Sequence, residues 1–548
     1  MVYIAKVRSG GKTFYYAQRT ERVDGRPTVV WRMPLGTAEN IVRVFQGKYL
    51  DHIEFRTFDF GLAAAILSVA EELDFINIVN RYTEKKHIDG LSVGEYLLLM
   101  TMARCHGPYS KRSTRLFFER SFLNLIWKVP HKLNSQNLIN HMGYIDDRAM
   151  DSISMELARK LVEKGFDVKY LIWDTTNFST NIEGWDSELL KSGNAKDKRF
   201  DRNLVGLGVG ISQDNIPIIH ETYPGNEHDA RLLERLIHSM VDRLKQLKMD
   251  AGKVVFVMDT GNNSEENIET VLKSMHIVGG LKRNQVPELM DVPLEKYEIL
   301  YVNRKGNVIR GYKTEKELYG RNFRVVVTYN ETTRKRQLRT YKRTKKRIIE
   351  GINDIARRFA RDEGRGRKMT VQGAEAAIHD LIPKNLRAVF HHDIDRKTRK
   401  ISFCIVENKE NELMKSFGKK AIFTDLFDWS PKKIAKAYNR KSELEDDFKL
   451  FKGKLLIPVV PVFHQDDDPI KVHVFLCVLG MLFVRYMMKR VAVKESLPRV
   501  LEELKRLRVA LIQDTRSGEA QLKVEQMNQI QARFFSALGL EKYLALRG

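Results

Sequence analysis

The chain has 548 residues, with 94 Lys and Arg against 70 Asp and Glu, a formal charge of +24, and 43% hydrophobic residues. This length is too great for one compact core and predicts roughly two to four domains, while the hydrophobic content excludes a disordered chain. The positive charge favours a polyanionic partner such as nucleic acid over a merely basic cytosolic protein, because each neutralised phosphate releases counterions.

The cysteines and the apolar segments predict a soluble intracellular protein. Cys105, Cys404 and Cys477 lie far apart, which argues against a disulfide framework, a zinc ribbon or a secreted location. The first residues, MVYIAKVRSGGK, lack the apolar core of a signal peptide. The apolar run from Val474 to Val484 is too short to span a bilayer and is predicted to be a buried helix.

The first 165 residues divide into two predicted regions. Residues 1–50 form a β-hairpin region, in which Tyr3–Val7 and Thr13–Tyr16 flank the turn Ser9-Gly10-Gly11. Residues 51–165 form a mainly helical domain, because apolar residues recur there at three- and four-residue spacing. We expect this domain to bind DNA, although its turn and basic helix start at 107–112 fit a plain bundle corner as well as a helix-turn-helix.

Residues 166–284 are predicted to alternate strands and helices. Strand runs at 168–173, 204–211 and 216–222 precede a helix at 229–247, a strand at 253–258, a helix at 264–274 and a short strand at 276–278. This order is that of the first segment of a ribonuclease-H-like α/β core. Many α/β proteins share portions of the order, so it is weak evidence alone.

The remaining residues are predicted to form an insertion, the second segment of the core, and a C-terminal segment. Residues 285–415 contain alternating strand runs and a basic stretch, with 15 Lys or Arg against 4 Asp or Glu between Arg334 and Lys368. We interpret that stretch as a basic helix that contacts the DNA backbone, the alternative being a solvated helix face. The second core segment covers 416–495, including a helix that starts near Pro431. Residues 496–548 are predicted to be a C-terminal helical segment that pairs with a partner subunit or packs on the core.

Two aspartates follow apolar strand runs. Asp174 ends the run Leu171-Ile172-Trp173, and Asp259 ends the run Val254–Met258. Ligands of α/β sheets bind at strand ends, so carboxylates there are candidates for holding a cation. For either aspartate alone, a turn or helix-capping role is the more common explanation.

A third acidic residue is selected by its place on a predicted helix. Tyr438, Lys441, Glu445 and Lys452 fall at positions 0, +3, +7 and +14, which puts a phenol, two cations and one carboxylate within about 60° of one helix face. The neighbouring acids point away or lie at the edge of this face; they are Glu443, Asp446 and Asp447. The alternative is an ordinary salt-bridged surface helix.

Three carboxylates with nearby cations suit metal-dependent phosphoryl transfer. Two divalent ions about 4 Å apart can activate an attacking oxygen and stabilise a leaving one. Magnesium prefers oxygen ligands, so Asp and Glu suffice without His or Cys. Cations and a tyrosine hydroxyl one turn away can hold the substrate phosphate.

This constellation resembles the DDE transposases of bacterial and archaeal insertion sequences, specifically the group with a Tyr-x2-Arg-x3-Glu-x6-Lys helix. Tyr438, Glu445 and Lys452 match that pattern. Lys441 stands where the family usually has Arg, so the charge is kept but the bidentate fork is lost. The other segments that carry the resemblance are 171–176, 208–226, 254–267 and 458–482.

The resemblance implies a transposase that cleaves DNA at transposon ends and transfers strands into target DNA. It implies a ribonuclease-H-like core with a β-rich insertion before Glu445, and Asp174, Asp259 and Glu445 as the catalytic ligands of two Mg2+ ions, with Mn2+ as a substitute. Tyr438, Lys441 and Lys452 would bind DNA phosphates. The expected partners are double-stranded DNA, as terminal inverted repeats and target DNA, and a second copy of the chain. The expected location is the prokaryotic cytoplasm, at the nucleoid and not at a membrane.

Two other functions fit the same sequence. One is a ribonuclease-H-like nuclease that cuts without strand transfer. The other is a catalytically inactive, transposase-derived DNA-binding protein, against which the intact set of three acids argues.

Overall fold

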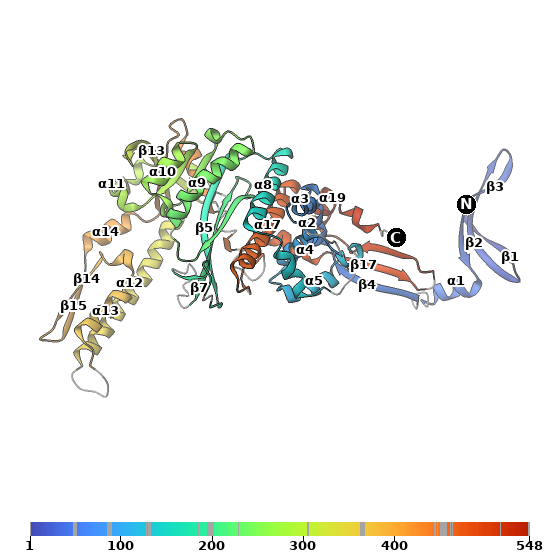
Figure 1. Cartoon of the computed structure of the whole chain (residues 1–548), viewed down its shortest axis with the longest axis horizontal. Coiled ribbons are helices and arrows are strands. Elements are labelled where there is room, and N and C mark those ends of the chain that lie inside the picture. Colours follow the sequence, from blue (N-terminus) through green and yellow to red (C-terminus); the bar gives the residue numbers. More distant parts are fainter. Residues whose placement is uncertain are drawn as a thin grey trace. The chain divides into compact units, whose positions relative to one another are not determined.

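The computed structural model describes residues 2–47, 52–84, 90–127, 129, 133–183, 186–193, 202–227, 229–303, 306–361, 368–442, 445, 448–449, 457–460, 462, 464–515 and 517–545. The protein is a mixed α/β structure with 48% helix and 27% strand. It divides into two compact units, Met1–Ile145 with Tyr486–Gly548, and Asp146–Arg485 (Figure 1).

The first unit begins with a small antiparallel sheet. Its strands are β1 (Val2–Ser9), β2 (Lys12–Val23) and β3 (Arg26–Gly36), in the order β1-β2-β3. The turn between β1 and β2 is made by Gly10 and Gly11, whose φ angles of 57° and 76° suit glycine. The predicted hairpin is therefore confirmed. The helix α1 (Ala38–Phe45) follows, capped by the Thr37 side chain, which accepts from the Asn40 amide.

Helices make up the core of the first unit, as predicted, but the predicted helical region 51–165 begins with a strand at 53–59, and its last helix, at 147–163, belongs to the second unit. The helices of the first unit's core are α2 (Gly61–Glu72), α3 (Phe75–Arg81), α4 (Val93–His106), α5 (Lys111–Arg120), α6 (Leu123–Ile126) and α7 (Ser135–Met142). Ten of the twelve residues of α2 are themselves buried, as expected of a central helix of this unit. Gly61 allows α18 (Leu497–Arg506) to approach, because a Cβ at Gly61 would collide with the Leu504 carbonyl oxygen.

The C-terminal segment 496–548, predicted to be helical, contains strands as well as helices. Two strands, β17 (Arg508–Asp514) and β18 (Ala520–Val524), lie between α18 and α19 (Gln529–Ala537). They join β4 (Ile53–Asp59) in the order β18-β17-β4, with Val509 opposite Phe58. The pairing partner of β17 lies near the other end of the chain, so a local hydrophobic pattern does not reveal it.

The second unit is built on a ten-stranded mixed sheet in the order β11-β12-β13-β16-β10-β9-β5-β7-β6, with β8 paired to β7. β9 is parallel to both β5 and β10, whereas β5 and β7 are antiparallel. The strands are β5 (Tyr170–Thr180), β6 (Lys191–Ser192), β7 (Asn203–Ile211), β8 (Pro217–Pro224), β9 (Val255–Met258), β10 (His276–Leu281), β11 (Glu298–Val302), β12 (Val308–Leu318), β13 (Arg321–Asn330) and β16 (Lys419–Thr424). The helices α8 (Asp147–Glu163), α9 (Asp229–Gln246), α10 (Glu265–Leu272) and α11 (Pro287–Asp291) belong to the same unit. The predicted succession of strand, hairpin, helix, strand and helix is confirmed.

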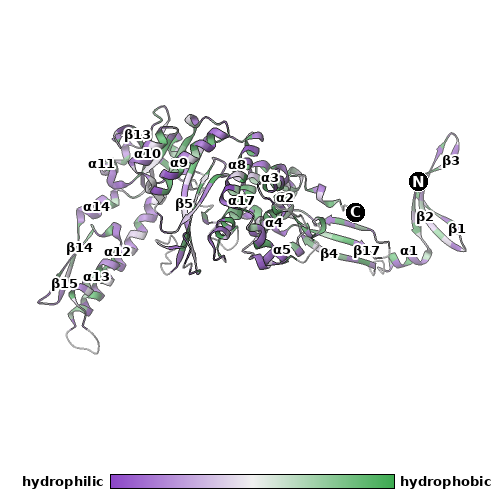
Figure 2. Ribbon diagram, in the orientation of Figure 1, coloured by the Kyte–Doolittle hydropathy of each residue, from purple (hydrophilic) through white to green (hydrophobic). Residues whose placement is uncertain are grey.

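The stretch 285–415 does not form one separate insertion. Its first three strands extend the central sheet, because β13 pairs with β16 along six residues. The rest has its own hydrophobic core, which includes Tyr341, Ile352, Phe359 and Ile378. The elements of this region, called the insertion lobe below, are α12 (Glu331–Ala360), α13 (Val371–Leu381), β14 (Phe390–Asp395), β15 (Lys400–Ile405) and α14 (Glu407–Lys415). The basic stretch is a helix as predicted, and Figure 2 shows α12 coloured largely as hydrophilic.

The apolar run at Val474–Val484 lies in α17 (Asp467–Val491). Among the described residues, α17 is the one helix long and apolar enough to cross a membrane, and 89% of its most apolar window is buried inside the protein. That burial is typical of the core helix of a soluble protein. The prediction of a buried helix is confirmed.

A partly buried histidine of the second unit predicts acid sensitivity. His220 on β8 stacks on Phe475 of α17 with ring centroids 5.3 Å apart, and burial lowers the pKa of His220 to about 4. The unfolded chain then binds a proton between pH 6.5 and 4 that the folded chain does not, so stability falls as pH falls through this window. We expect wild type to lose about 2 kcal/mol more than His220→Phe between pH 7 and pH 5. Urea unfolding at the two pH values measures the difference, and equal losses would refute the assignment.

Candidate active site

Asp174 and Asp259 lie side by side because of the register of two parallel strands. β5 and β9 pair with Ile172 opposite Val257, and each aspartate lies two residues further along its own strand direction. Alternate residues of a strand share one face, so both carboxylates are presented on the same face of the sheet. Asp259 directly follows β9, as predicted.

The expectation that a strand ends at Asp174 is wrong. β5 continues to Thr180 and pairs with β7 over its whole second half, from Thr175 opposite Gly208 to Thr180 opposite Asn203. The apolar run stops at Trp173 because polar side chains follow, but the backbone remains extended. Asp174 therefore stands inside a strand at the point where β9 ends beside it.

The helix α15 (Pro431–Asn439) brings the third group of residues to the aspartates. Ser430 caps its first turn by accepting from the Lys433 amide, and Pro431 occupies the first helical position. α15 ends at Asn439, so the predicted helix is interrupted at Arg440, and Lys441, Ser442 and Glu445 are helical beyond that turn. Lys452, Glu443, Asp446 and Asp447 lie outside the described residues.

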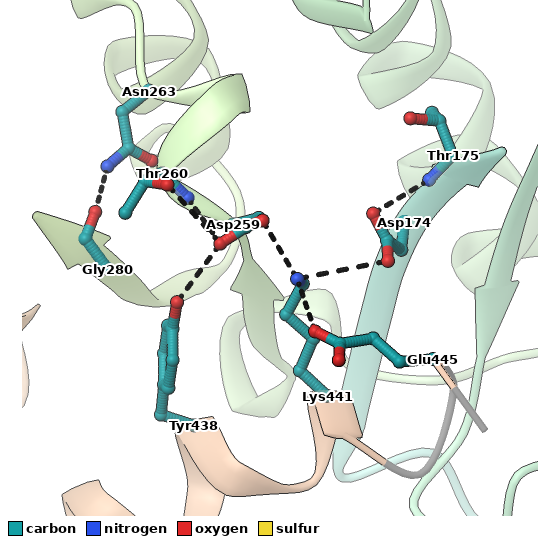
Figure 3. A network of polar contacts seen from close by, with 9 residues as sticks. All are labelled: Asp174, Thr175, Asp259, Thr260, Asn263, Gly280, Tyr438, Lys441 and Glu445. Atoms are coloured by element: carbon teal, nitrogen blue, oxygen red, sulfur yellow. Dashed lines mark hydrogen bonds and ion pairs between the residues drawn. The ribbon is translucent and has the colours of Figure 1, made fainter. Parts of the chain in front are cut away.

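Lys441 stands between all three predicted catalytic acids (Figure 3). Its Nζ lies 2.9 Å from Asp259 Oδ2, 3.1 Å from Glu445 Oε1 and 3.8 Å from Asp174 Oδ2. The lysine side chain is 7% exposed, against 16% for Asp174, 39% for Asp259 and 51% for Glu445. The acids that the sequence selected from three separate segments are thus brought together around one ammonium group.

Tyr438 reaches the same cluster from α15. Its hydroxyl donates to Asp259 Oδ1 at 3.2 Å, while Lys441 donates to the other oxygen of that carboxylate. The prediction that Tyr438, Lys441 and Glu445 share one side is therefore confirmed. Gly280 of β10 leaves room for Tyr438, because a Cβ there would collide with the hydroxyl.

The charges in the cluster stabilise one another. Burial acts to lower the pKa of Lys441, but the three carboxylates outweigh it and raise that pKa, so the ammonium stays protonated. Burial acts to raise the pKa of Asp259, but Lys441 and the Thr260 amide outweigh it and lower that pKa, so the carboxylate stays ionised. Burial and the adjacent Asp259 raise the pKa of Tyr438, which keeps its proton and remains a donor.

Backbone amides fix the two aspartates. The Thr175 N–H donates to Asp174 Oδ1 at 2.9 Å, and the Thr260 N–H donates to Asp259 Oδ1 at 2.8 Å. Asn263 ties the loop after Asp259 to β10 by donating to the Gly280 carbonyl oxygen. These contacts hold both carboxylates in place without using the oxygens that face Lys441, which are the two Oδ2 atoms.

Lys420 is a member of the site that sequence reasoning missed. It lies on β16 with its Nζ 4.5 Å from the centroid of the Tyr438 ring. Although the residue is exposed overall, desolvation of its ammonium lowers the pKa of Lys420, and Asp259 offsets this effect without cancelling it. In the sequence, Lys419-Lys420 before an apolar strand is typical of a solvated strand end. Lys419 has a different role, since its Nζ donates to the carbonyl oxygens of Met290 and Val292.

The donor set fits a hard divalent cation in its chemistry, since three carboxylates from separate elements converge on one positive charge. The distances of these carboxylate oxygens from Lys441 Nζ are those of hydrogen bonds and ion pairs to an ammonium group. Among the described residues, no group of three or more His, Cys, Asp and Glu side chains stands at metal-ligand spacing. Mg2+ binds oxygen at about 2.0–2.1 Å, so the carboxylates would have to move inward.

Comparisons with known proteins add no family. No family model and no curated protein matches the chain at a significant level.

Proposed function

We propose that the protein is a DDE transposase with a ribonuclease-H-like core, which cleaves DNA at the ends of a mobile element and joins those ends to target DNA. The observation that carries the proposal is the convergence of Asp174, Asp259 and Glu445 on a single cation. Three acids from two strands and a distant helix have no need to meet in a merely structural site. The three carboxylates repel one another when they are brought together, and a metal-binding function would account for an arrangement that is otherwise unfavourable.

Asp174, Asp259 and Glu445 are the residues that would hold two Mg2+ ions, with Mn2+ as a substitute. When bound, the ions supply activation of the attacking oxygen and stabilisation of the leaving oxygen. Tyr438 holds one oxygen of Asp259 by its hydrogen bond and thereby orients the carboxylate. The two reactions are attack of water on the phosphodiester at the element's end, and attack of the freed 3′-hydroxyl on target DNA.

Cations beside the carboxylates would hold the flanking phosphates. Tyr438, Lys441 and Lys452 have this role by resemblance, and Lys420 joins them because its exposed side chain lies over the Tyr438 ring. An ammonium donates up to three hydrogen bonds and suits a phosphate oxygen as a point charge.

A line of arginines on α12 supports DNA as the substrate. Arg336, Arg339, Arg343 and Arg347 are all exposed and fall within about 80° of one helix face, over about 16 Å. This arginine stripe lies opposite the buried side of α12, which packs into the core of the insertion lobe. Within the residues that the structure describes, none of the four is in an ion pair with a carboxylate. The stripe ends at Glu350.

Several other cations on the same helix are paired. Lys335 lies 3.9 Å from Glu331, Lys346 lies 3.8 Å from Glu350, and Arg357 and Arg358 lie 3.6 and 3.0 Å from Asp354. A row of cations that are not in ion pairs is suited to contact the successive phosphates of a DNA backbone. Each such contact adds affinity because it releases counterions. We propose that the stripe contacts double-stranded DNA of the element's ends or target, with a second copy of the chain on the other end.

The test is cleavage and joining of a DNA fragment that carries the flanking ends of this gene's own locus, with Mg2+ and a supercoiled target. Cuts at the element ends followed by joined products are expected. Cuts without joined products would instead indicate a ribonuclease-H-like nuclease. Specific binding to the ends with no cuts in Mg2+ or Mn2+ would indicate a catalytically inactive DNA-binding protein.

A further inference from the structure

Lys441 occupies the centre of the carboxylate cluster. Its Nζ is within hydrogen-bonding distance of Asp259 and Glu445 and within ion-pair distance of Asp174, and its side chain is the least exposed of the four (Figure 3). A surface salt bridge would join one cation to one acid and leave both side chains in water. Lys441 has instead replaced much of its hydration by three carboxylates.

The ammonium compensates the repulsion that the acids would otherwise have. Three carboxylates that face one point repel one another, and water screens this repulsion least at Asp174, whose side chain is 16% exposed. The aspartates cannot relax away easily, because backbone amides of Thr175 and Thr260 hold one oxygen of each. A cation at the point of convergence therefore stabilises the assembled cluster in the absence of metal.

The same position excludes a divalent ion. An ion bound to Asp259 Oδ2 and Glu445 Oε1 needs both oxygens at about 2.0–2.1 Å. Lys441 Nζ already donates to these two atoms, at 2.9 and 3.1 Å. The ammonium and the ion need the same space and carry charge of the same sign, so binding of one displaces the other.

Lysine is better suited than arginine to occupy the centre of the cluster temporarily. Its charge is compact and sits on a flexible four-carbon stem, so it can leave the cluster by rotation of the side chain. The residue also stands one turn before Glu445, so a displaced ammonium remains beside the site and next to the phosphate that we propose to bind there.

We propose that Lys441 is a tethered cation that holds Asp174, Asp259 and Glu445 together in the metal-free protein and is displaced when a divalent ion binds. The proposal rests on the transposase function given above and adds a positioning role for Lys441. It makes Lys441 a competitor of the metal as well as a partner of the acids.

The test measures Mn2+ binding to the full chain by isothermal titration calorimetry. Lys441→Met removes the competing charge at similar side-chain volume and is expected to bind Mn2+ about 10-fold or more tightly than wild type. Lys441→Arg keeps the charge and is expected to bind Mn2+ no more tightly than wild type. In EDTA, Lys441→Met should melt at a lower temperature than wild type and recover more on addition of Mn2+.

Equal or weaker Mn2+ binding by Lys441→Met would overturn the tethered cation while leaving the transposase function intact. Failure of every variant and of wild type to bind Mn2+ would overturn both. If Lys441→Met does not fold, a second measurement tests the same displacement without that variant. In wild type labelled with 13C at lysine Cε, the signal absent from Lys441→Arg should shift on addition of Mg2+, and an unchanged signal would refute displacement.

Discussion

Glu445→Gln and Asp259→Asn are each expected to lower the rate of Mg2+-dependent cleavage by about 1000-fold or more, while DNA affinity in EDTA stays the same or increases slightly. Each change keeps the side-chain shape and removes one negative charge. Loss of a metal-ligating carboxylate weakens charge stabilisation in the transition state by several kcal/mol, and each 1.4 kcal/mol is a factor of ten in rate. The proposed phosphate contacts are made by cationic and hydroxyl groups, so they do not depend on these acids.

The matched control is Glu234→Gln. Glu234 is exposed on α9 in the same unit and does not belong to the carboxylate cluster, so cleavage should stay within about twofold of wild type. Rates from single-turnover cleavage and affinities from fluorescence anisotropy give the two measurements. Wild-type cleavage rates in Glu445→Gln would remove Glu445 from the catalytic set.

The two aspartates were predictable from sequence because the signal is local. An apolar run followed by Asp at 171–174 and at 254–259 predicts that each acid lies in or directly after a strand, whatever the rest of the chain does. What the sequence does not contain is the register. Only the pairing of Ile172 with Val257 shows that the two acids meet on one face, and only the continued pairing with β7 shows that β5 passes Asp174 without ending.

The third acid was predictable from helical periodicity, and the role of its neighbour was not. Spacing put Lys441 on the face of Glu445, which the i, i+4 contact of 3.1 Å confirms. Helical spacing does not determine which groups the Lys441 ammonium contacts. A contact with a DNA phosphate was therefore as compatible with the sequence as the contacts with Asp174 and Asp259 that the structure shows. Lys420 was missed for a related reason, since its distance from Tyr438 depends on how β16 packs against α15.

Long-range strand pairing accounts for the larger errors in the predicted fold. β11, β12 and β13 were expected in a separate insertion because, after the second aspartate, consecutive strand runs replace the earlier alternation of strands and helices. Yet β13 joins the central sheet through β16. β17 was expected as helix and pairs with β4. In both cases the partner strand lies far away in the chain. A hydrophobic pattern shows which face of a strand is buried, but it does not show which other strand it pairs with.

Neutralising the arginine stripe is expected to reduce affinity for double-stranded DNA by about 100-fold or more at 0.15 M salt. The variant carries Arg336→Gln, Arg339→Gln, Arg343→Gln and Arg347→Gln. If each arginine contacts one phosphate, the slope of log affinity against log salt should become shallower by about 3–4, because each lost contact removes about 0.9 from the slope. The four side chains lie opposite the core of the insertion lobe, so the melting temperature should change little.

A second variant of α12 separates this contact from a general effect of charge. It carries Lys335→Gln, Lys346→Gln, Arg357→Gln and Arg358→Gln, which removes an equal number of positive charges, but from cations that already face Glu331, Glu350 and Asp354. Long-range attraction falls equally in both variants, whereas only the stripe variant loses direct phosphate contacts. The control should therefore lose less than about tenfold in affinity and about one or less in slope. Equal losses in the two variants would mean that α12 attracts DNA only through its net charge, and the contact line would have to be sought on another surface.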